Sequence, residues 1–204
     1  GQPAVRKQRR LRSWRHPDLD DRLGRRRMLA EARLMVRLYK SGLNIPVLYD
    51  CDIKEQQLVM SNVPGRPLIE LLNDDSIDDV TMMKHLQSAG YSIRMLHRQA
   101  IVHGDLSTNN IMITPIGEAV LIDFGLAKIE FETELYGIDL HVLFEILGAS
   151  HPHREGAMEA VLQGYKQCEQ DLGTAAKTPG GDPVSMEDVI ERFDLIRTRV
   201  RYHG

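Results

Sequence analysis

The chain has 204 residues, of which 42% are hydrophobic and 27% charged, and its formal net charge is −3. A chain of this length and composition can bury a core in one or two small lobes, which excludes an intrinsically disordered protein. No apolar run reaches the roughly 20 residues of a membrane span, and the basic N-terminus lacks the apolar stretch of a signal peptide.

The N-terminal part of the chain predicts a small β-rich lobe. Apolar spacing and chain-breaking residues predict, in order, a strand and loop at 3–12, a helix at 18–41, and hairpin strands at 46–53 and 57–63. Pro17 stops the first segment, and Gly42 ends the helix. The run Pro64-Gly-Arg-Pro67 breaks the chain, so we place a boundary there between two predicted domains, 1–64 and 65–204.

The C-terminal part is predicted to be helical on both sides of a central motif. Apolar spacing predicts helices at 79–98, 138–147 and 154–169, then a Gly/Pro-rich loop at 173–183 and a last helix. The residues between the motif and 138 are expected to be irregular. The last helix opens with the capping-box-like Ser185-Met-Glu-Asp188. His151 and His153 are expected in a plain loop, because no carboxylate or cysteine stands at metal-ligand spacing.

The central motif is residues 101–127, IVHGDLSTNNIMITPIGEAVLIDFGLA. Asp105 and Asn110 lie in its polar loop, and Asp123 follows a strand-like run in Asp-Phe-Gly. In phosphoryl transfer, one aspartate accepts the hydroxyl proton, while an asparagine and a second aspartate hold the Mg²⁺ ions that bridge the ATP phosphates. His-x-Asp and Asp-Phe-Gly are each weak motifs. Their order and separation together predict a protein-kinase-like catalytic core, in preference to two strand-end turns with capping aspartates.

The remaining parts of a kinase site have weaker candidates. A kinase needs a strand lysine that holds the α/β-phosphates and a helix glutamate that fixes this lysine. Lys7 is the candidate lysine, and the alternative is that it is one cation of a basic run. Glu31 is the candidate glutamate, and the alternative is a solvated carboxylate on a helix. The candidate for the connecting segment, whose backbone groups would bind an adenine, is Met60, Ser61, Asn62 and Val63. The alternative is a plain edge strand.

A wider set of elements accompanies these motifs: Arg15-His-Pro17, Leu23-Gly-Arg-Arg-Arg27, Glu31-Ala-Arg33, His103-Gly-Asp-Leu106, Asn110, Leu121-Ile-Asp-Phe-Gly125, Asp139-Leu140 and Ser150-His-Pro152. Together they resemble the small atypical kinase of the KEOPS (EKC) complex, a family that includes the PRPK-type protein kinases. The resemblance covers nearly the whole chain apart from 173–183. The Arg-His-Pro and Glu-Ala-Arg elements are expected to separate the chain from other kinases with His-Gly-Asp, such as RIO-type and aminoglycoside kinases.

The resemblance implies an α+β, protein-kinase-like bilobal fold with a small, N-terminally truncated β-rich lobe and a mainly helical C-lobe. It implies that Lys7 binds phosphate with Glu31 as its ion-pair partner, that Asp105 is catalytic, that Asn110 and Asp123 bind magnesium, and that Asp139 braces the catalytic loop. It further implies Ser/Thr phosphorylation or ATP hydrolysis in support of threonylcarbamoyladenosine modification of tRNA. The implied partners are a threonylcarbamoyl transferase subunit and small accessory subunits. The implied location of the protein is the cytoplasm and the nucleus.

Several departures from the kinase pattern are visible in the sequence. Gly104 replaces the arginine that pairs with a phosphorylated activation loop, and no Ala-Pro-Glu follows, so we expect activity that is independent of Thr133 or Tyr136 phosphorylation. Ser107 replaces a lysine near the γ-phosphate, which favours slow chemistry or hydrolysis. There is no G-x-G-x-x-G, and the chain begins almost at the lysine strand, which indicates a fragment or a small lobe of three strands.

Charge is unevenly distributed, which suggests a polyanionic partner such as tRNA. Basic residues gather at 6–15, 22–27 and 197–201, and acidic ones at 70–79 and 130–134. A solvated helix face is an equally supported interpretation of Arg25–Arg27. Cys51 and Cys168 lack a CxxC spacing, so a reducing compartment is expected. Three hypotheses remain: a Mg-ATP enzyme, a kinase-fold scaffold that binds the transferase and tRNA, and, more weakly, an aminoglycoside-type kinase.

Overall fold

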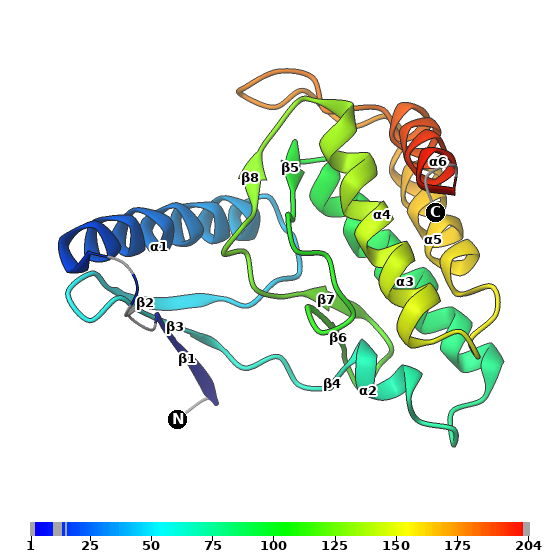
Figure 1. Ribbon diagram of the computed structural model, residues 1–204, viewed down its shortest axis with the longest axis horizontal. Helices are drawn as coiled ribbons and strands as arrows, with labels where there is room; N and C mark the ends of the chain where they lie inside the picture. Colours follow the sequence, from blue (N-terminus) through cyan, green and yellow to red (C-terminus); the bar gives the residue numbers. More distant parts are fainter. Residues whose placement is uncertain (1–2, 10–13, 15, 202–204) are drawn as a thin grey trace.

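The computed structural model describes residues 3–9, 14 and 16–201 and combines helices with small antiparallel sheets (Figure 1). A sheet and the long helix α1 lie at one end of the molecule, and helices α3 to α6 lie at the other. The short strands β4 to β8 lie between them. This arrangement confirms the α+β, kinase-like fold class with a helical C-terminal part. The division into domains at residue 64 stays a prediction.

The N-terminal sheet has the strand order β1-β3-β2, with all neighbours antiparallel. Its strands are β1 (Ala4–Gln8), β2 (Leu48–Asp52) and β3 (Gln57–Ser61). The register places Lys7 opposite Leu58. Because side chains alternate along a strand, Lys7 of β1 and Arg9, which comes just after its last residue, are expected on one face. Residues 10–13 and 15, which include much of the expected basic run and the arginine of Arg-His-Pro, lie outside the described residues.

Helix α1 (Pro17–Lys40) packs on this sheet through buried residues at helical spacing, among them Met28, Met35 and Leu38. Pro17 occupies the first turn, where its missing N–H is not needed, so it begins the helix and does not merely end the strand before it. Gly42 follows the helix with a φ of +81°, a conformation that glycine adopts without strain. The bounds expected for this helix were therefore right to within one residue.

Short strands position the catalytic loop and the Asp-Phe-Gly sequence. Strand β4 (Arg66–Pro67) pairs with β6 (Ile111–Ile113), which pairs with β7 (Ala119–Leu121). Strand β5 (Ile101–Val102) pairs with β8 (Lys128–Ile129). The catalytic loop, 103–110, therefore runs from β5 to β6, and Asp123 follows β7 after one intervening residue, Ile122.

The C-terminal helices differ in places from the sequence expectations. They are α2 (Leu68–Leu72), α3 (Asp79–His97), α4 (Thr133–Ser150), α5 (Ala157–Leu172) and α6 (Met186–Arg201). Helix α2 was not expected. Helix α4 begins at 133 and not at 138, because Tyr136 is fully buried and its hydroxyl donates to the carbonyl oxygen of Glu130. Helix α5 begins at 157 and not at 154, because Gly156 adopts a left-handed φ of +75° and Arg154 holds the 72–79 loop. Within the described residues, no helix is both long and apolar enough to cross a membrane.

Helices α3 and α5 approach each other closely at Gly90 and Gly164, which gives a test of the packing. A Cβ atom at Gly90 would lie 1.8 Å from the carbonyl oxygen of Val161, whereas nothing lies within 4 Å of a Cβ at Gly148 on α4. We expect Gly90→Ala to lower the free energy of unfolding by about 1–3 kcal/mol, because the helices must move apart. Gly148→Ala should raise it by about 0.5–1 kcal/mol, since alanine is the better helix former. Urea unfolding of both variants measures the difference, and equal values would contradict this close approach.

Candidate active site

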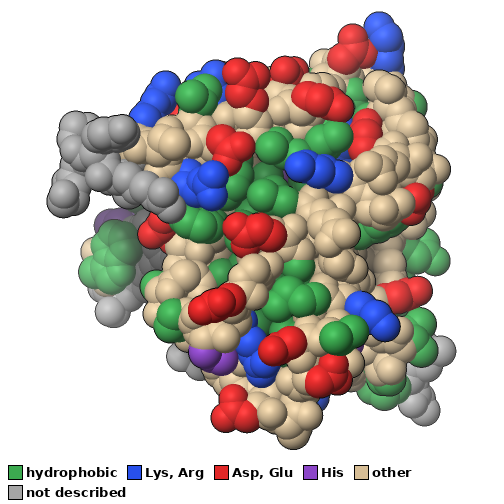
Figure 2. Space-filling model, turned by 90° about the vertical axis from the view of Figure 1, so that its right-hand side faces the viewer, with side chains coloured by type: hydrophobic (Ala, Val, Ile, Leu, Met, Phe, Trp, Pro, Cys, Tyr) green, Lys and Arg blue, Asp and Glu red, His purple; other side chains and the backbone are tan. Residues whose placement is uncertain are grey.

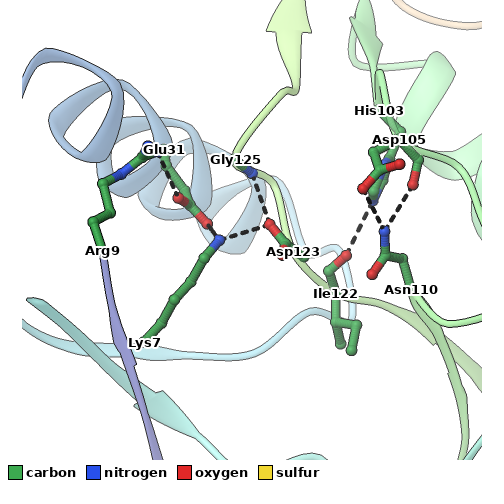
Figure 3. Close-up of polar contacts among 9 residues, drawn as sticks. All are labelled: Lys7, Arg9, Glu31, His103, Asp105, Asn110, Ile122, Asp123 and Gly125. Atoms are coloured by element: carbon green, nitrogen blue, oxygen red, sulfur yellow. Dashed lines mark hydrogen bonds and ion pairs between the residues drawn. The ribbon is translucent and has the colours of Figure 1, made fainter. Parts of the chain in front are cut away.

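The lysine expected on the first strand reaches two carboxylates at once. Lys7 Nζ lies 2.6 Å from Glu31 Oε1 and 2.6 Å from Asp123 Oδ1 (Figure 3). These three residues come from β1, α1 and the segment after β7. The structure therefore brings together the lysine, its expected helix partner and the Asp-Phe-Gly aspartate.

Glu31 is a buried carboxylate and not a solvated one, since its side chain is 2% exposed. Its Oε1 accepts the hydrogen bond from Lys7. Its Oε2 is buried and accepts no hydrogen bond from any described residue. Arg9 Nη2 lies 3.9 Å from this oxygen.

Asp123 has a backbone conformation that is rare for a residue other than glycine, with a φ of +62°. Such strained positions cluster at functional sites. Its Oδ1 accepts hydrogen bonds from Lys7 and from the Gly125 N–H, at 2.6 and 3.1 Å. Burial alone would raise the pKa of Asp123, but the hydrogen bond and charge of Lys7 and the Gly125 N–H outweigh it and lower that pKa. The carboxylate is therefore anionic at neutral pH, and its Oδ2 has no hydrogen-bond donor among the described residues.

The catalytic loop holds Asp105 and Asn110 together. The Asn110 Nδ2 donates to the backbone oxygen of Asp105 at 2.8 Å and to its Oδ2 at 3.0 Å. These bonds leave Asp105 Oδ1 and Asn110 Oδ1 as acceptors without a donor in the described part of the chain. Asp105 is exposed, so its free oxygen is accessible to a substrate hydroxyl.

Asp139 of α4 fixes the start of this loop. Its Oδ2 accepts from the His103 N–H at 2.6 Å, and its Oδ1 from the Gly104 N–H at 2.9 Å. His97 Nε2 lies 3.3 Å from Oδ2, and His97 Nδ1 lies 2.8 Å from the Tyr165 hydroxyl. Burial lowers the pKa of His97 despite the attraction of Asp139, so the ring is neutral. The neutral ring donates from Nε2 to Asp139 and accepts from Tyr165 at Nδ1.

A cavity of about 390 Å³ opens beside Lys7. Lys7, Glu31 and Asp123 lie at its polar part, and the segment 60–63 lines it as well. Its apolar lining includes Val5, Met35, Met60, Met112 and Ile122. The N–H of Ser61 already donates to Val47 and that of Asn62 to Pro3. Of this segment, Val63 alone keeps its backbone N–H without a partner among the described residues, so it is the group that remains available to a ligand.

The oxygen atoms that are left free in the site suit Mg²⁺, and the cavity beside them suits a nucleotide. Magnesium prefers carboxylate and amide oxygens, and Asp123 Oδ2 and Asn110 Oδ1 are such atoms without competing donors. A lysine held by two carboxylates offers its charge to phosphate oxygens, and an apolar cavity ending in a free backbone N–H suits a base. No cluster of three or more His, Cys, Asp or Glu residues that could hold another metal is found within the described residues. His153 Nε2 contacts the backbone oxygen of Leu72.

Two parts of the site were missed by the sequence analysis. His97 and Tyr165 complete the support of Asp139. His97 stands 42 residues from Asp139 and 68 residues from Tyr165 along the chain, and nothing in the local sequence pattern connects them. Arg9 was counted only as part of a basic run. Its spacing of two from Lys7 on a strand was the available indication that it also faces Glu31.

This fold and this arrangement of side chains are those of a protein-kinase-like protein. A sequence model of the RIO domain matches residues 4–131. The EKC/KEOPS complex subunit BUD32 of Gibberella zeae is 34% identical, over 81% of this chain and 70% of that protein. The EKC/KEOPS complex subunit Tp53rkb of Mus musculus is 32% identical, over 98% of this chain and 80% of that protein. This chain therefore belongs to the Bud32 family of RIO-domain proteins, which confirms the resemblance.

A third relative is a longer protein. The "Probable bifunctional tRNA threonylcarbamoyladenosine biosynthesis protein" of Methanosarcina mazei is 33% identical over 99% of this chain but only 32% of its own length. The RIO match shows that the chain shares this domain with RIO-type kinases. That the Arg-His-Pro and Glu-Ala-Arg elements separate the chain from those kinases stays a prediction. The family supports activity of the kinase or ATPase type in general.

Proposed function

We propose that this chain binds Mg-ATP between Lys7 and the 60–63 segment and transfers its γ-phosphoryl group to a Ser/Thr hydroxyl or to water. The observation that carries the proposal is Lys7 Nζ at 2.6 Å from both Glu31 and Asp123, beside an apolar cavity. The bound group supplies an electrophilic phosphoryl centre, with charge on its oxygens reduced by Mg²⁺. Asn110 and Asp123 are the residues that would hold the metal.

The chain's own residues have separate tasks in this proposal. Lys7 holds phosphate oxygens, and Glu31 keeps the lysine in place. Asp105 accepts the proton of the attacking hydroxyl at its free oxygen, while its other oxygen stays bonded to Asn110. Positioning and charge stabilisation of this kind account for most of the catalysis in phosphoryl transfer.

The segment after Asp-Phe-Gly supports activity that does not need phosphorylation. A Cβ atom at Gly104 would lie 2.7 Å from the carbonyl oxygen of Leu126, so this segment lies directly on the catalytic loop, where an arginine would not fit. The Glu130 N–H donates to Ala100, and β8 pairs with β5. Tyr136 is fully buried and Thr133 begins α4, so the segment is already ordered by the unmodified chain.

Nucleotide binding by the parent chain and two lysine variants tests the proposal. We expect Lys7→Met to weaken Mg-ATP binding at least about 10-fold, because the phosphates lose a charge-assisted hydrogen bond. Lys84→Met removes an exposed cation on α3 and should leave the affinity unchanged. Titration calorimetry with Mg-ATP measures both. Absence of binding by the parent chain would overturn the enzyme proposal and favour the kinase-fold scaffold.

We further propose that the chain serves as a subunit of a KEOPS-type complex that supports threonylcarbamoyladenosine modification of tRNA, in cytoplasm and nucleus. The names of the fungal and mouse relatives support complex membership, and the name of the methanogen protein supports the tRNA modification. A transferase subunit and small accessory subunits are the proposed partners. Co-purification of this chain with such a transferase is the direct test.

A row of cations on α1 favours tRNA contact. Arg22, Arg26, Arg33 and Lys40 are exposed, share one helix face by their spacing, and form no ion pair with any described residue. Arg25 is instead paired with Asp21 at 2.9 Å. On the face formed by the C-terminal helices, acidic and basic side chains of the described residues are interspersed (Figure 2).

The basic tail is less available, since Arg197 bonds to Asp194 at 2.9 Å and lies over the rings of Phe144 and Phe193. We therefore expect the α1 cations to dominate the salt dependence of tRNA binding. The triple change of Arg22, Arg26 and Arg33 to alanine should reduce the slope of log K against log salt by roughly 2–3. Arg66→Ala, which removes a cation paired with Asp74 and Glu70, should leave it unchanged. Salt-insensitive binding of a tRNA transcript would contradict phosphate contact.

A further inference from the structure

The residue just after β1 brings a second cation toward the buried glutamate. Arg9 follows Lys7 by two residues, and its N–H donates to the Gln56 oxygen at 3.2 Å, which extends the β1–β3 pairing to this position. Both side chains reach the same carboxylate, Lys7 at Oε1 and Arg9 at Oε2 (Figure 3). Within the described residues, these are the only cations within 4.0 Å of Glu31.

Glu31 Oε2 is the unsatisfied atom of the site. It is buried, accepts no hydrogen bond from a described residue, and faces the backbone of Gly125, where a Cβ atom would lie only 3.5 Å away. A buried carboxylate oxygen without a donor is costly. Arg9 Nη2 stands at 3.9 Å, just beyond hydrogen-bond range, and the Arg9 side chain is 25% exposed, so it has room to move.

We propose that Arg9 is a positioning residue that holds Glu31 while Lys7 is engaged by the nucleotide phosphates. This inference rests on the proposed Mg-ATP function. In the structure, Lys7 donates hydrogen bonds to both Glu31 and Asp123. Once part of that charge is directed to phosphate oxygens, a carboxylate held by Lys7 alone is free to turn about its last side-chain bond. A guanidinium on Oε2 fixes its plane, and Lys7 then keeps its place.

The charges of the four groups balance only when Arg9 is included. Lys7 and Arg9 contribute two positive charges, and Glu31 and Asp123 two negative ones. In the metal-free structure, a single lysine beside Glu31 and Asp123 would leave one carboxylate charge unbalanced. Arg9 removes that excess without occupying the place of the phosphates.

Kinetics of Arg9 variants test the role. Because Lys7 holds phosphate in both ground and transition states, Arg9→Met should raise KM for Mg-ATP on the order of 10-fold while kcat changes less. Arg9→Lys, which keeps the charge, should restore most of the affinity. Lys84→Met, which removes an exposed cation from α3, should leave KM unchanged. A loss of kcat at unchanged KM would indicate a contact made only in the transition state, or a loss of folded protein, and would overturn the proposal.

A double-variant cycle separates Arg9's action through Glu31 from a direct phosphate contact. In a Glu31→Gln background, Arg9→Met should have no further effect on KM or on the Kd for Mg-ATP. An undiminished effect there would overturn the proposal in favour of direct phosphate binding. Urea unfolding of the same four chains reports the coupling of Arg9 with Glu31 without nucleotide. If unfolding shows this coupling but the parent chain binds no Mg-ATP, the proposed function is wrong. Arg9 would then be a contact that only stabilises the fold.

Discussion

Replacing Asp105 by asparagine should lower kcat for phosphoryl transfer or ATP hydrolysis by about 10²–10⁴-fold while the Kd for Mg-ATP stays close to that of the parent chain. The reason is that Asp105 presents a free, exposed Oδ1, the only part of this carboxyl group that could accept a proton. An amide oxygen in its place can still accept the hydrogen bond from Asn110, so the loop keeps its shape. Steady-state turnover with a generic protein substrate and with water measures the loss.

The matched control for this change is Asp75→Asn, which removes an exposed carboxylate between α2 and α3. It alters the net charge by the same amount and should leave kcat unchanged. Turnover of the Asp105 variant equal to that of the parent chain would show that another group accepts the proton, or that the measured activity comes from a contaminant. Equal losses in both variants would point to net charge and not to a catalytic base.

The parts of the site that could be predicted were those written as local sequence. Asp105, Asn110 and Asp123 belong to short motifs, so the sequence alone identifies them. Lys7 and Glu31 had only weak local indications, and the pairing between them depends on β1 and α1 folding onto each other. The structure brings them to 2.6 Å, which the spacing along the chain alone does not imply.

The supporting contacts could not be predicted, because they join distant segments through burial. Nothing near His97 indicates that it meets Asp139 and Tyr165, and nothing near Gly104 indicates that Leu126 lies against it. Helix ends failed for the same reason. The start of α4 depends on the buried Tyr136, whose hydroxyl bonds to a residue before the helix. Periodicity finds the apolar face of a helix, whereas its first residue is decided by contacts with other segments.

Asp139→Ala should be the most destabilising single change at the site, lowering the free energy of unfolding by about 3–5 kcal/mol. The Asp139 side chain is 4% exposed and accepts hydrogen bonds from His103, Gly104 and His97. Alanine would leave two backbone N–H groups and one ring N–H without acceptors, and each buried donor so orphaned costs about 1–3 kcal/mol. Urea unfolding followed by far-ultraviolet circular dichroism measures the loss.

Asp182→Ala is the reference for this change, because Asp182 is 67% exposed and, among the described residues, forms an ion pair only with the exposed Lys177. It should cost less than about 1 kcal/mol. Asp139→Asn keeps one acceptor oxygen, so it should be less destabilising than alanine. It should still lower kcat, since the backbone of Gly104 leads directly into Asp105. If Asp139→Ala unfolds at the same urea concentration as Asp182→Ala, the buried bonds contribute no net stability, and the catalytic loop must be held by packing alone.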